Sequence, residues 1–506
     1  MSETAAAPRL DLATKVTYGL GSVAQGVGLV ALSTTIINYY LVSVVGLRPA
    51  VVGLVILVSL VIDAVLDPAI GRWSDTFRSR LGRRHPFMYA SAIPIALATC
   101  FLWRNPGHLT GDALAVYVLT MLVVLRVAGG LYQIPSDALA PELAPDYHER
   151  TTLISWRWFF GLVGFVGVTI VLNGVFLRKD AAHPLGQNDP NAYAAFGILA
   201  AAIAVASILI SALTTQRYIP FLTAAPARRQ SAAETAREIV GILANRSLLA
   251  IMASGLISGV ATGISSSLQG FMSFYFWGLT PQTVALITFA VAPASIIGVI
   301  AAPLLTRMLD KKRTMITVFT LSVFTGVIPV TLRLLGVLPP NGSGLVPVIL
   351  AADLFVSSVL GLSGFVIVGS MVADVVEDSA VKTGVRSEGL LFAANGLLPK
   401  ITGGLGAVVG NLLLEFVRFP TGALANPAVH VTPAVMRQLA LISLPVGAIL
   451  NLAAIAVLGF YRIDRRSHEA NLEALRLASA VTEPPTGVAG SGAAVGGDPG
   501  PYSTPV

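Results

Sequence analysis

The sequence predicts an all-α membrane protein of about twelve spanning helices, and three observations support this fold class. Of the 506 residues, 55% are hydrophobic and only 12% are charged. The mean hydropathy of +0.77 is far above that of soluble globular domains. Apolar stretches of roughly 20 residues, the length that a bilayer requires, recur from about Lys15 to Tyr461. Lipid is therefore the expected solvent for most of the chain.

An even number of spans places both termini on the same side of the membrane. Most Lys and Arg residues fall in the segments on that side, which predicts cytoplasmic termini. The predicted spans lie near residues 16–45, 48–72, 85–104, 113–137, 151–177, 192–216, 247–278, 282–309, 314–338, 344–374, 386–417 and 433–461.

The predicted spans fall into two groups of six. Residues 1–216 form the first half and 247–461 the second, with a basic, polar cytoplasmic linker at 217–246. The turns GRWSDTFRSRLGRR and PLLTRMLDKKR place an acid and a basic cluster at matching positions in the two halves. Two six-helix halves are typical of secondary transporters of the major facilitator type. Residues 462–506, rich in Gly, Pro and Ala, are expected to be a disordered cytoplasmic tail.

Composition argues against several other classes of protein. The net charge of +7 is spread over short loops rather than gathered on one face, so no nucleic-acid partner is expected. A single cysteine excludes a disulfide framework. The six histidines fall mostly in predicted loops without metal-ligand spacing, so neither a membrane-embedded enzyme nor a cofactor is expected.

Two acidic residues fall inside the second predicted span, LVSLVIDAVLDPAIGRW. Asp63 and Asp67 are four residues apart and therefore share one helical face. A charge at mid-membrane costs about 2.5–3.5 kcal/mol, and two neighbouring anions require a cation, a proton or a basic partner. Basic candidates inside other spans are Arg126, Arg157 and Lys400. An alternative is that the two acids only form salt bridges with neighbouring helices.

These residues, with the segments IPSDALAPELAPDYHERTTLISWRWFF and MVADVVEDSAVKTGVRSEG, resemble the glycoside-pentoside-hexuronide:cation symporter family of the major facilitator superfamily. The melibiose carrier is typical of this family. The resemblance implies that Asp63 and Asp67 bind the coupling cation, either a proton or sodium. It also implies that Arg157 binds sugar and that Lys400 links the cation and sugar sites.

The same resemblance implies roles for charged residues at the cytoplasmic ends of the helices. Asp75, Arg83 and Arg84 match the loop motif of the superfamily. An alternative is that these charges only set topology and pair on the surface. Four further charges match residues that hold the cytoplasmic gate: Glu149, Arg150, Glu377 and Arg386.

The chain also departs from the family pattern. Gly26 and Gln133 stand where the family has acids, and Asp137 stands where an aromatic ring stacks on the sugar. Galactosides are therefore disfavoured as substrates. Leu66 and Gly130 replace two residues with neutral oxygen ligands. Because sodium prefers several oxygens and a proton needs one carboxylate, the sequence favours proton coupling.

The resulting hypothesis is a cation-coupled secondary active symporter that imports a sugar, glycoside or sugar acid by alternating access. It is expected to be a monomer in a bacterial-type inner membrane, with the bilayer and a small-molecule substrate as partners. The alternative is a carrier of a lysolipid or another amphiphile on the same fold. The residues expected to bind or couple substrate are Gln25, Arg126, Gln133, Asp137, Arg157 and Lys400.

Overall fold

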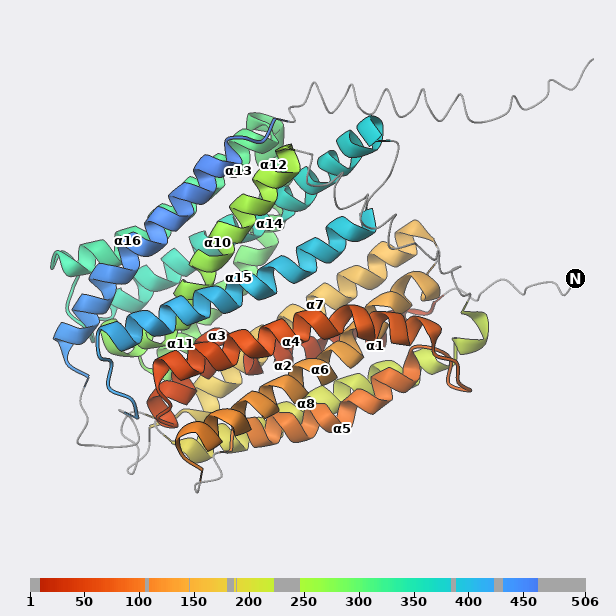
Figure 1. Ribbon diagram of the computed structural model, residues 1–506, viewed down its shortest axis with the longest axis horizontal. Helices are drawn as coiled ribbons and strands as arrows, with labels where there is room; N and C mark the ends of the chain where they lie inside the picture. The colour runs from red at the N-terminus through yellow and green to blue at the C-terminus, as the bar shows by residue number, and fades with distance from the viewer. Residues whose placement is uncertain are drawn as a thin grey trace, which may run out of the picture.

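The computed structural model describes residues 10–104, 109–144, 146–179, 186–187, 189–222, 246–383, 388–422 and 431–462. Within these ranges the regular structure is helical, without strands. In the part of the chain that the structure describes, eleven helical segments are long and apolar enough to cross a membrane. A further long helix, α15 (Glu388–Phe416), runs beside them (Figure 1). The ends of these segments match most of the predicted spans to within a few residues.

Helices α1 to α8 form one group, here called the first bundle, and α10 to α16 form the second bundle (Figure 1). The first bundle contains α1 (Leu12–Leu20), α2 (Ser22–Ala31), α3 (Thr34–Tyr39), η1 (Tyr40–Val44), α4 (Pro49–Thr76), α5 (His85–Leu102), α6 (Gly111–Leu143), α7 (Tyr147–Val171), η2 (Leu172–Phe176) and α8 (Pro190–Gln216). A short turn, η3 (Ile219–Phe221), follows α8.

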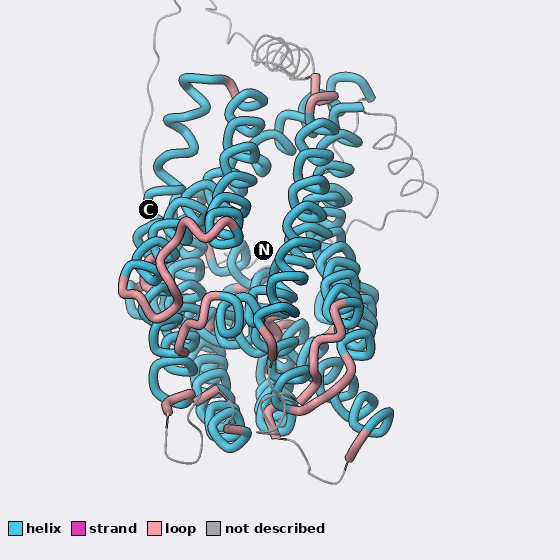
Figure 2. The backbone as a smooth tube through the Cα atoms, turned by 90° about the vertical axis from the view of Figure 1, so that its left-hand side faces the viewer, coloured by secondary structure: helices cyan, strands magenta, loops and turns pink. Residues whose placement is uncertain are grey.

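The second bundle contains α10 (Arg246–Phe271), η4 (Met272–Phe276), α11 (Pro281–Thr288), α12 (Val291–Leu309), α13 (Lys311–Leu334), α14 (Leu345–Thr383), α15, and α16 (Pro433–Leu458). The two bundles stand side by side (Figure 2). They meet mainly where α4 packs on α15, where α3 packs on α10, and where α7 packs on α11.

The helix ends define two faces of the molecule. The termini face holds the first residues of α1, the last residues of α16 and the connection from α4 to α5. The far face holds the connections from η1 to α4 and from α15 to α16. The π-helical turns η1, η2 and η4 lie at the far face.

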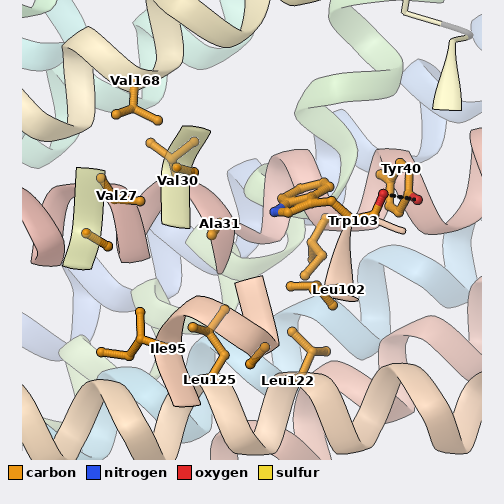
Figure 3. Close-up of a cluster of buried hydrophobic side chains, with 14 of the residues drawn as sticks. Val27, Val30, Ala31, Tyr40, Ile95, Leu102, Trp103, Leu122, Leu125 and Val168 are labelled. Carbon is orange, nitrogen blue, oxygen red and sulfur yellow. Dashed lines mark hydrogen bonds between the residues drawn. The ribbon is translucent and has the colours of Figure 1, made fainter. Parts of the chain in front are cut away.

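Apolar side chains fill the first bundle and also cover its outside. Val30, Leu122 and Trp103 are almost fully buried in its core (Figure 3). The Tyr40 hydroxyl donates a hydrogen bond to the Trp103 carbonyl at 3.1 Å, which satisfies a polar group inside this core. Ile93 is 69% exposed, one of many exposed apolar side chains. Such a surface suits lipid, whose tails are as apolar as leucine.

The first predicted span is broken rather than continuous. The sequence predicted one helix near 16–45, whereas the structure divides Leu12–Val44 into α1, α2, α3 and η1. One break lies at Gly21, between α1 and α2. The second lies at Leu32 and Ser33, between α2 and α3, where the backbone of Ser33 leaves the helical conformation with a ψ of 121°. Discontinuous helices are a known device of transporters for exposing backbone groups near mid-membrane. The predicted linker lies mostly outside the described residues, and so does the tail beyond Arg462.

Close packing of α10 on α15 yields a test of the fold. A Cβ atom added at Gly406 would lie 2.3 Å from the Val260 carbonyl oxygen, whereas one at Gly403 would meet nothing within 4 Å. We expect Gly406→Ala to lower the free energy of unfolding by about 1–3 kcal/mol through overpacking. Gly403→Ala should leave it unchanged or raise it by up to about 1 kcal/mol. Thermal unfolding in detergent measures both, and equal melting temperatures would contradict this packing.

Candidate functional site

An ion-pair cluster joins the two bundles near the middle of α4 and α15. The Lys400 Nζ atom lies 2.7 Å from Asp63 Oδ2 and also contacts Asp67 Oδ2. The side chains of Asp63, Asp67 and Lys400 are 9%, 31% and 28% exposed. The structure thus brings together the two acids of one helical face and a lysine from the other bundle. The ammonium compensates two carboxylates that would otherwise repel each other.

Arg126 lies beside this cluster within the first bundle. Its Nε atom donates a hydrogen bond to Ser59 Oγ at 3.1 Å, about one turn of α4 before Asp63. Its guanidinium also interacts electrostatically with Asp63. Arg126 on α6 therefore adds a second positive charge near Asp63.

Arg157 forms a separate cluster between α1, α6 and α7. Its Nη1 atom donates to Tyr18 Oη at 2.9 Å and to Ser136 Oγ at 2.8 Å. Its Nη2 atom pairs with Asp137, and the guanidinium lies 5.1 Å from the centre of the Tyr18 ring. Arg157 is 9% exposed, whereas the Asp137 side chain is 51% exposed. The buried arginine thus holds a carboxylate that a ligand can still reach.

Two side-chain amides lie near the Asp137 carboxylate, those of Gln25 and Gln133. The Gln25 Nε2 atom is buried. A side-chain amide can donate two hydrogen bonds and accept two. Asp137, Gln25 and Gln133 therefore form one polar group that can hydrogen-bond a ligand.

Helix packing explains one departure from the family pattern. A Cβ atom at Gly26 would lie 2.5 Å from the Gly161 carbonyl oxygen and 2.5 Å from the Phe165 backbone nitrogen. The backbones of α2 and α7 touch at this point. An acidic side chain at Gly26 does not fit here.

The predicted loop-motif residues meet at the termini face of the first bundle. Arg84 pairs with Asp75 at 2.6 Å and with Glu142 at 3.2 Å, and Arg83 pairs with Glu142 at 3.1 Å. Arg84 also donates to Ser74 Oγ at 2.8 Å. Sequence reasoning missed Glu142, the central acid of this network, because it stood near a predicted loop without a motif of its own.

A matching pair lies in the second bundle. Lys311, at the start of α13, contacts both carboxylate oxygens of Asp374 on α14 at 2.7 Å. Lys311 belongs to the turn whose sequence echoes that of the first half. Asp374 was not singled out in the sequence, although it occupies the acidic end of α14 as Glu142 does in α6.

The structure describes the side chains of two of these four predicted gate residues. Glu149 pairs with Lys15 at 2.8 Å, inside the first bundle. Arg150 Nε donates to the Ala144 carbonyl at 3.3 Å, also inside the first bundle. The side chain of Glu377 and the whole of Arg386 lie outside the described residues.

Comparisons with known proteins agree with this fold. The family model of MFS/sugar transport proteins matches residues 17–465. An uncharacterised symporter, sll1374, from Synechocystis is 24% identical, covering 92% of this chain and 97% of its own. The isoprimeverose transporter of Lactiplantibacillus pentosus is 24% identical, covering 89% of this chain and 88% of its own. A putative glycoside/cation symporter, YagG, of Escherichia coli is 27% identical over 42% of this chain and 44% of its own.

Solved structures share the fold at low sequence identity. The nucleoside transporter NupG has a TM-score of 0.58 and 15% identity, covering 88% of this chain and 98% of its own. The xylose transporter XylE from E. coli, in an inward open conformation, has a TM-score of 0.59 and 13% identity, covering 91% and 98%.

The helical bundles, the charged groups inside them and these similarities define a multi-pass membrane transporter of the major facilitator superfamily rather than an enzyme. Within that superfamily, the chain belongs to the MFS/sugar transport protein family.

The network around Glu142 yields a stability prediction. Arg84 and Glu142 are 8% and 10% exposed, so Glu142→Gln leaves two arginines without their shared buried partner. We expect the free energy of unfolding to fall by about 3 kcal/mol. The control Asp75→Asn removes a half-exposed partner of Arg84 and should cost less than about 1 kcal/mol. Denaturation in detergent measures both variants, and similar losses would contradict the central role of Glu142.

Proposed function

We propose that the protein is a cation-coupled symporter that imports a sugar, glycoside or sugar acid by alternating access. The observation that carries the proposal is the contact of Lys400, on the second bundle, with both Asp63 and Asp67, on the first. Intramembrane ionisable groups that pair across a transporter typically mark an ion or substrate path. The names of the relatives, a glycoside/cation symporter and an isoprimeverose transporter, support the substrate class.

In this mechanism Lys400 acts as a tethered cation. Its ammonium occupies the position between the two carboxylates that a coupling ion would take. A cation on Asp67 competes with the ammonium and weakens the link between α4 and α15. The released lysine is then available to the substrate, and the two bundles are free to rock. Ion and substrate are coupled because each binds better when the other is present.

The geometry favours a proton as the coupling ion. Asp67 Oδ1 would lie 3.1 Å from a Cβ atom at Gly130, so the residue beside this carboxylate is one without a side-chain oxygen. Leu66, next to Asp67 in α4, contributes none either. Sodium requires several oxygen ligands, whereas one carboxylate oxygen is enough for a proton.

The second cluster supplies groups suited to a hydroxylated or acidic substrate. Arg157 presents a guanidinium fixed by Tyr18 and Ser136, and such a fork recognises carboxylates and hydroxyl oxygens. The half-exposed Asp137 can accept hydrogen bonds from sugar hydroxyls, and the side-chain amides of Gln25 and Gln133 lie beside it. A sugar or sugar acid matches this set of groups better than an apolar molecule does.

We also propose where the protein lies in the cell and how its chain is divided into parts. The excess of basic residues on the termini face supports cytoplasmic termini in a bacterial-type inner membrane. We assign residues 1–216 and 247–461 to the two moving halves, 217–246 to the linker between them, and 462–506 to a cytoplasmic tail. Each monomer contains both clusters and needs no partner subunit for transport.

Uptake into liposomes tests the function. With purified protein, we expect accumulation of a sugar or sugar acid driven by an inward proton gradient and not by a sodium gradient alone. Asp67→Asn should reduce gradient-driven uptake at least about tenfold, because the paired site loses the acid that exchanges the cation. Asp112→Asn, an exposed acid at the start of α6, is the charge-matched control and should transport normally.

Two outcomes would change the proposal. Full uptake by Asp67→Asn would remove the proposed cation site. Uptake of lysolipids, with no transport of sugars, would retain the transporter class and replace the substrate class.

Adding an oxygen beside Asp67 tests the choice of ion. We expect Gly130→Ser to make uptake responsive to sodium, because the new hydroxyl would lie next to Asp67 Oδ1 as a neutral ligand. Gly130→Ala adds the same Cβ atom without the oxygen and is the matched control. Measured under separate proton and sodium gradients, an unchanged ion dependence in Gly130→Ser would argue against this account of selectivity.

A further inference from the structure

A series of contacts closes the far face between the bundles. The Thr35 hydroxyl donates to the Ser266 carbonyl and the Asn38 amide to the Ser267 carbonyl, both at 2.9 Å. The Gly422 backbone nitrogen donates to the Val42 carbonyl at 2.9 Å. Most of these contacts involve backbone atoms or small polar groups. One charged residue, Glu415, makes a different kind of contact there.

Glu415 is the second-last residue of α15 (Glu388–Phe416) and reaches the beginning of α4 in the other bundle. Its Oε1 atom pairs with Arg48 Nη2 at 3.0 Å, and its Oε2 atom accepts a hydrogen bond from the Ala50 backbone nitrogen at 3.0 Å. The residue at the N-cap of α4 is Arg48, whose side chain makes no capping bond, and Pro49 follows it. Glu415 therefore supplies the capping acceptor that the α4 sequence itself does not.

This arrangement ties the stability of one helix end to the conformation of the transporter. A capping side chain normally belongs to the helix that it caps, and its loss costs about 0.5–2 kcal/mol. Here the acceptor belongs to α15. When the bundles part at the far face, α4 must exchange this acceptor for water, and Arg48 loses its partner.

We propose that Glu415 is the latch of the far-face gate, and this inference rests on the alternating-access function proposed above. The latch holds α4 to α15 in the state described here. It must open whenever substrate enters from the far face.

The test measures opening of the far face directly, without substrate. Ser43 in η1 is fully buried near Tyr275 of the second bundle. Ser43→Cys is close to isosteric and keeps a side-chain hydrogen-bond donor beside Tyr275. The probe is purified full-length protein in detergent carrying Ser43→Cys and Cys100→Ala, labelled with a hydrophilic maleimide. The labelling rate reports how often the far face opens.

The latch predicts a graded series of labelling rates. Glu415→Ala removes both contacts and should raise the labelling rate about fivefold, the effect of losing one helix cap. Arg48→Ala removes only the exposed ion pair and should raise it about twofold. Adding Arg48→Ala to Glu415→Ala should have no further effect, since both act through one carboxylate.

A matched control exists in the first bundle. Asp11 caps α1 by accepting from the Thr14 backbone nitrogen at 3.0 Å, and it pairs with Arg217 at 2.9 Å. Hydrogen bonds from Thr14 lower the pKa of the Asp11 carboxyl to about 2, so it is charged at neutral pH. Asp11→Ala thus removes a cap and an ion pair that do not cross between bundles, and it should leave the labelling rate of the introduced thiol unchanged.

Several results would overturn the latch. They are a wild-type labelling rate in Glu415→Ala, an equal increase in Asp11→Ala, or a larger effect from Arg48→Ala than from Glu415→Ala. If Glu415→Ala does not fold, Glu415→Gln, which keeps an oxygen acceptor but loses the charge, should raise the rate at least as much as Arg48→Ala. A wild-type rate in Glu415→Gln would then reject the latch. Faster labelling in a protein that transports no sugar would retain the latch and reject the proposed substrate.

Discussion

The contact of Lys400 with Asp63 and Asp67 is the interaction on which the arrangement of the bundles depends. Each of these charges alone would cost about 2.5–3.5 kcal/mol at mid-membrane. Together they compensate one another across the interface of α4 and α15. Close approach of these helices makes this possible, since a Cβ atom at Gly404 would lie 2.8 Å from Leu57 Cδ1. The ion pairs and the close packing of the helices thus favour the same alignment of α4 with α15.

The two basic residues of the site have different surroundings. Arg157 is bound by Tyr18, Ser136 and Asp137, all in the first bundle, so motion between bundles leaves its contacts intact. Lys400 has its acidic partners in the opposite bundle, so the same motion must change its contacts. Arg157 is therefore suited to bind a ligand throughout the motion. Lys400 is suited to respond to binding of the coupling ion.

Composition and the recurrence of long apolar stretches were enough to predict the fold class and most helix ends, because lipid requires long apolar helices. The spacing of Asp63 and Asp67 predicted that they share a face, but did not show which of three basic residues pairs with them, since that choice depends on helix packing. Glu142 was missed because its importance comes from two arginines that lie far away in the chain, in the turn before α5. The α6 and α14 helices extend past the predicted spans to Leu143 and Thr383, where polar residues end the apolar pattern without ending the helix.

The break in the first span at Leu32 and Ser33 separates segments with different neighbours. On one side, α2 packs against α7 and α8 within the first bundle, whereas α3 on the other side packs against α10 of the second. If α2 and α3 formed one continuous helix, any tilt of α3 would also tilt α2. With the break, the far end of this span can follow α10 while the part beside Gln25 keeps its place.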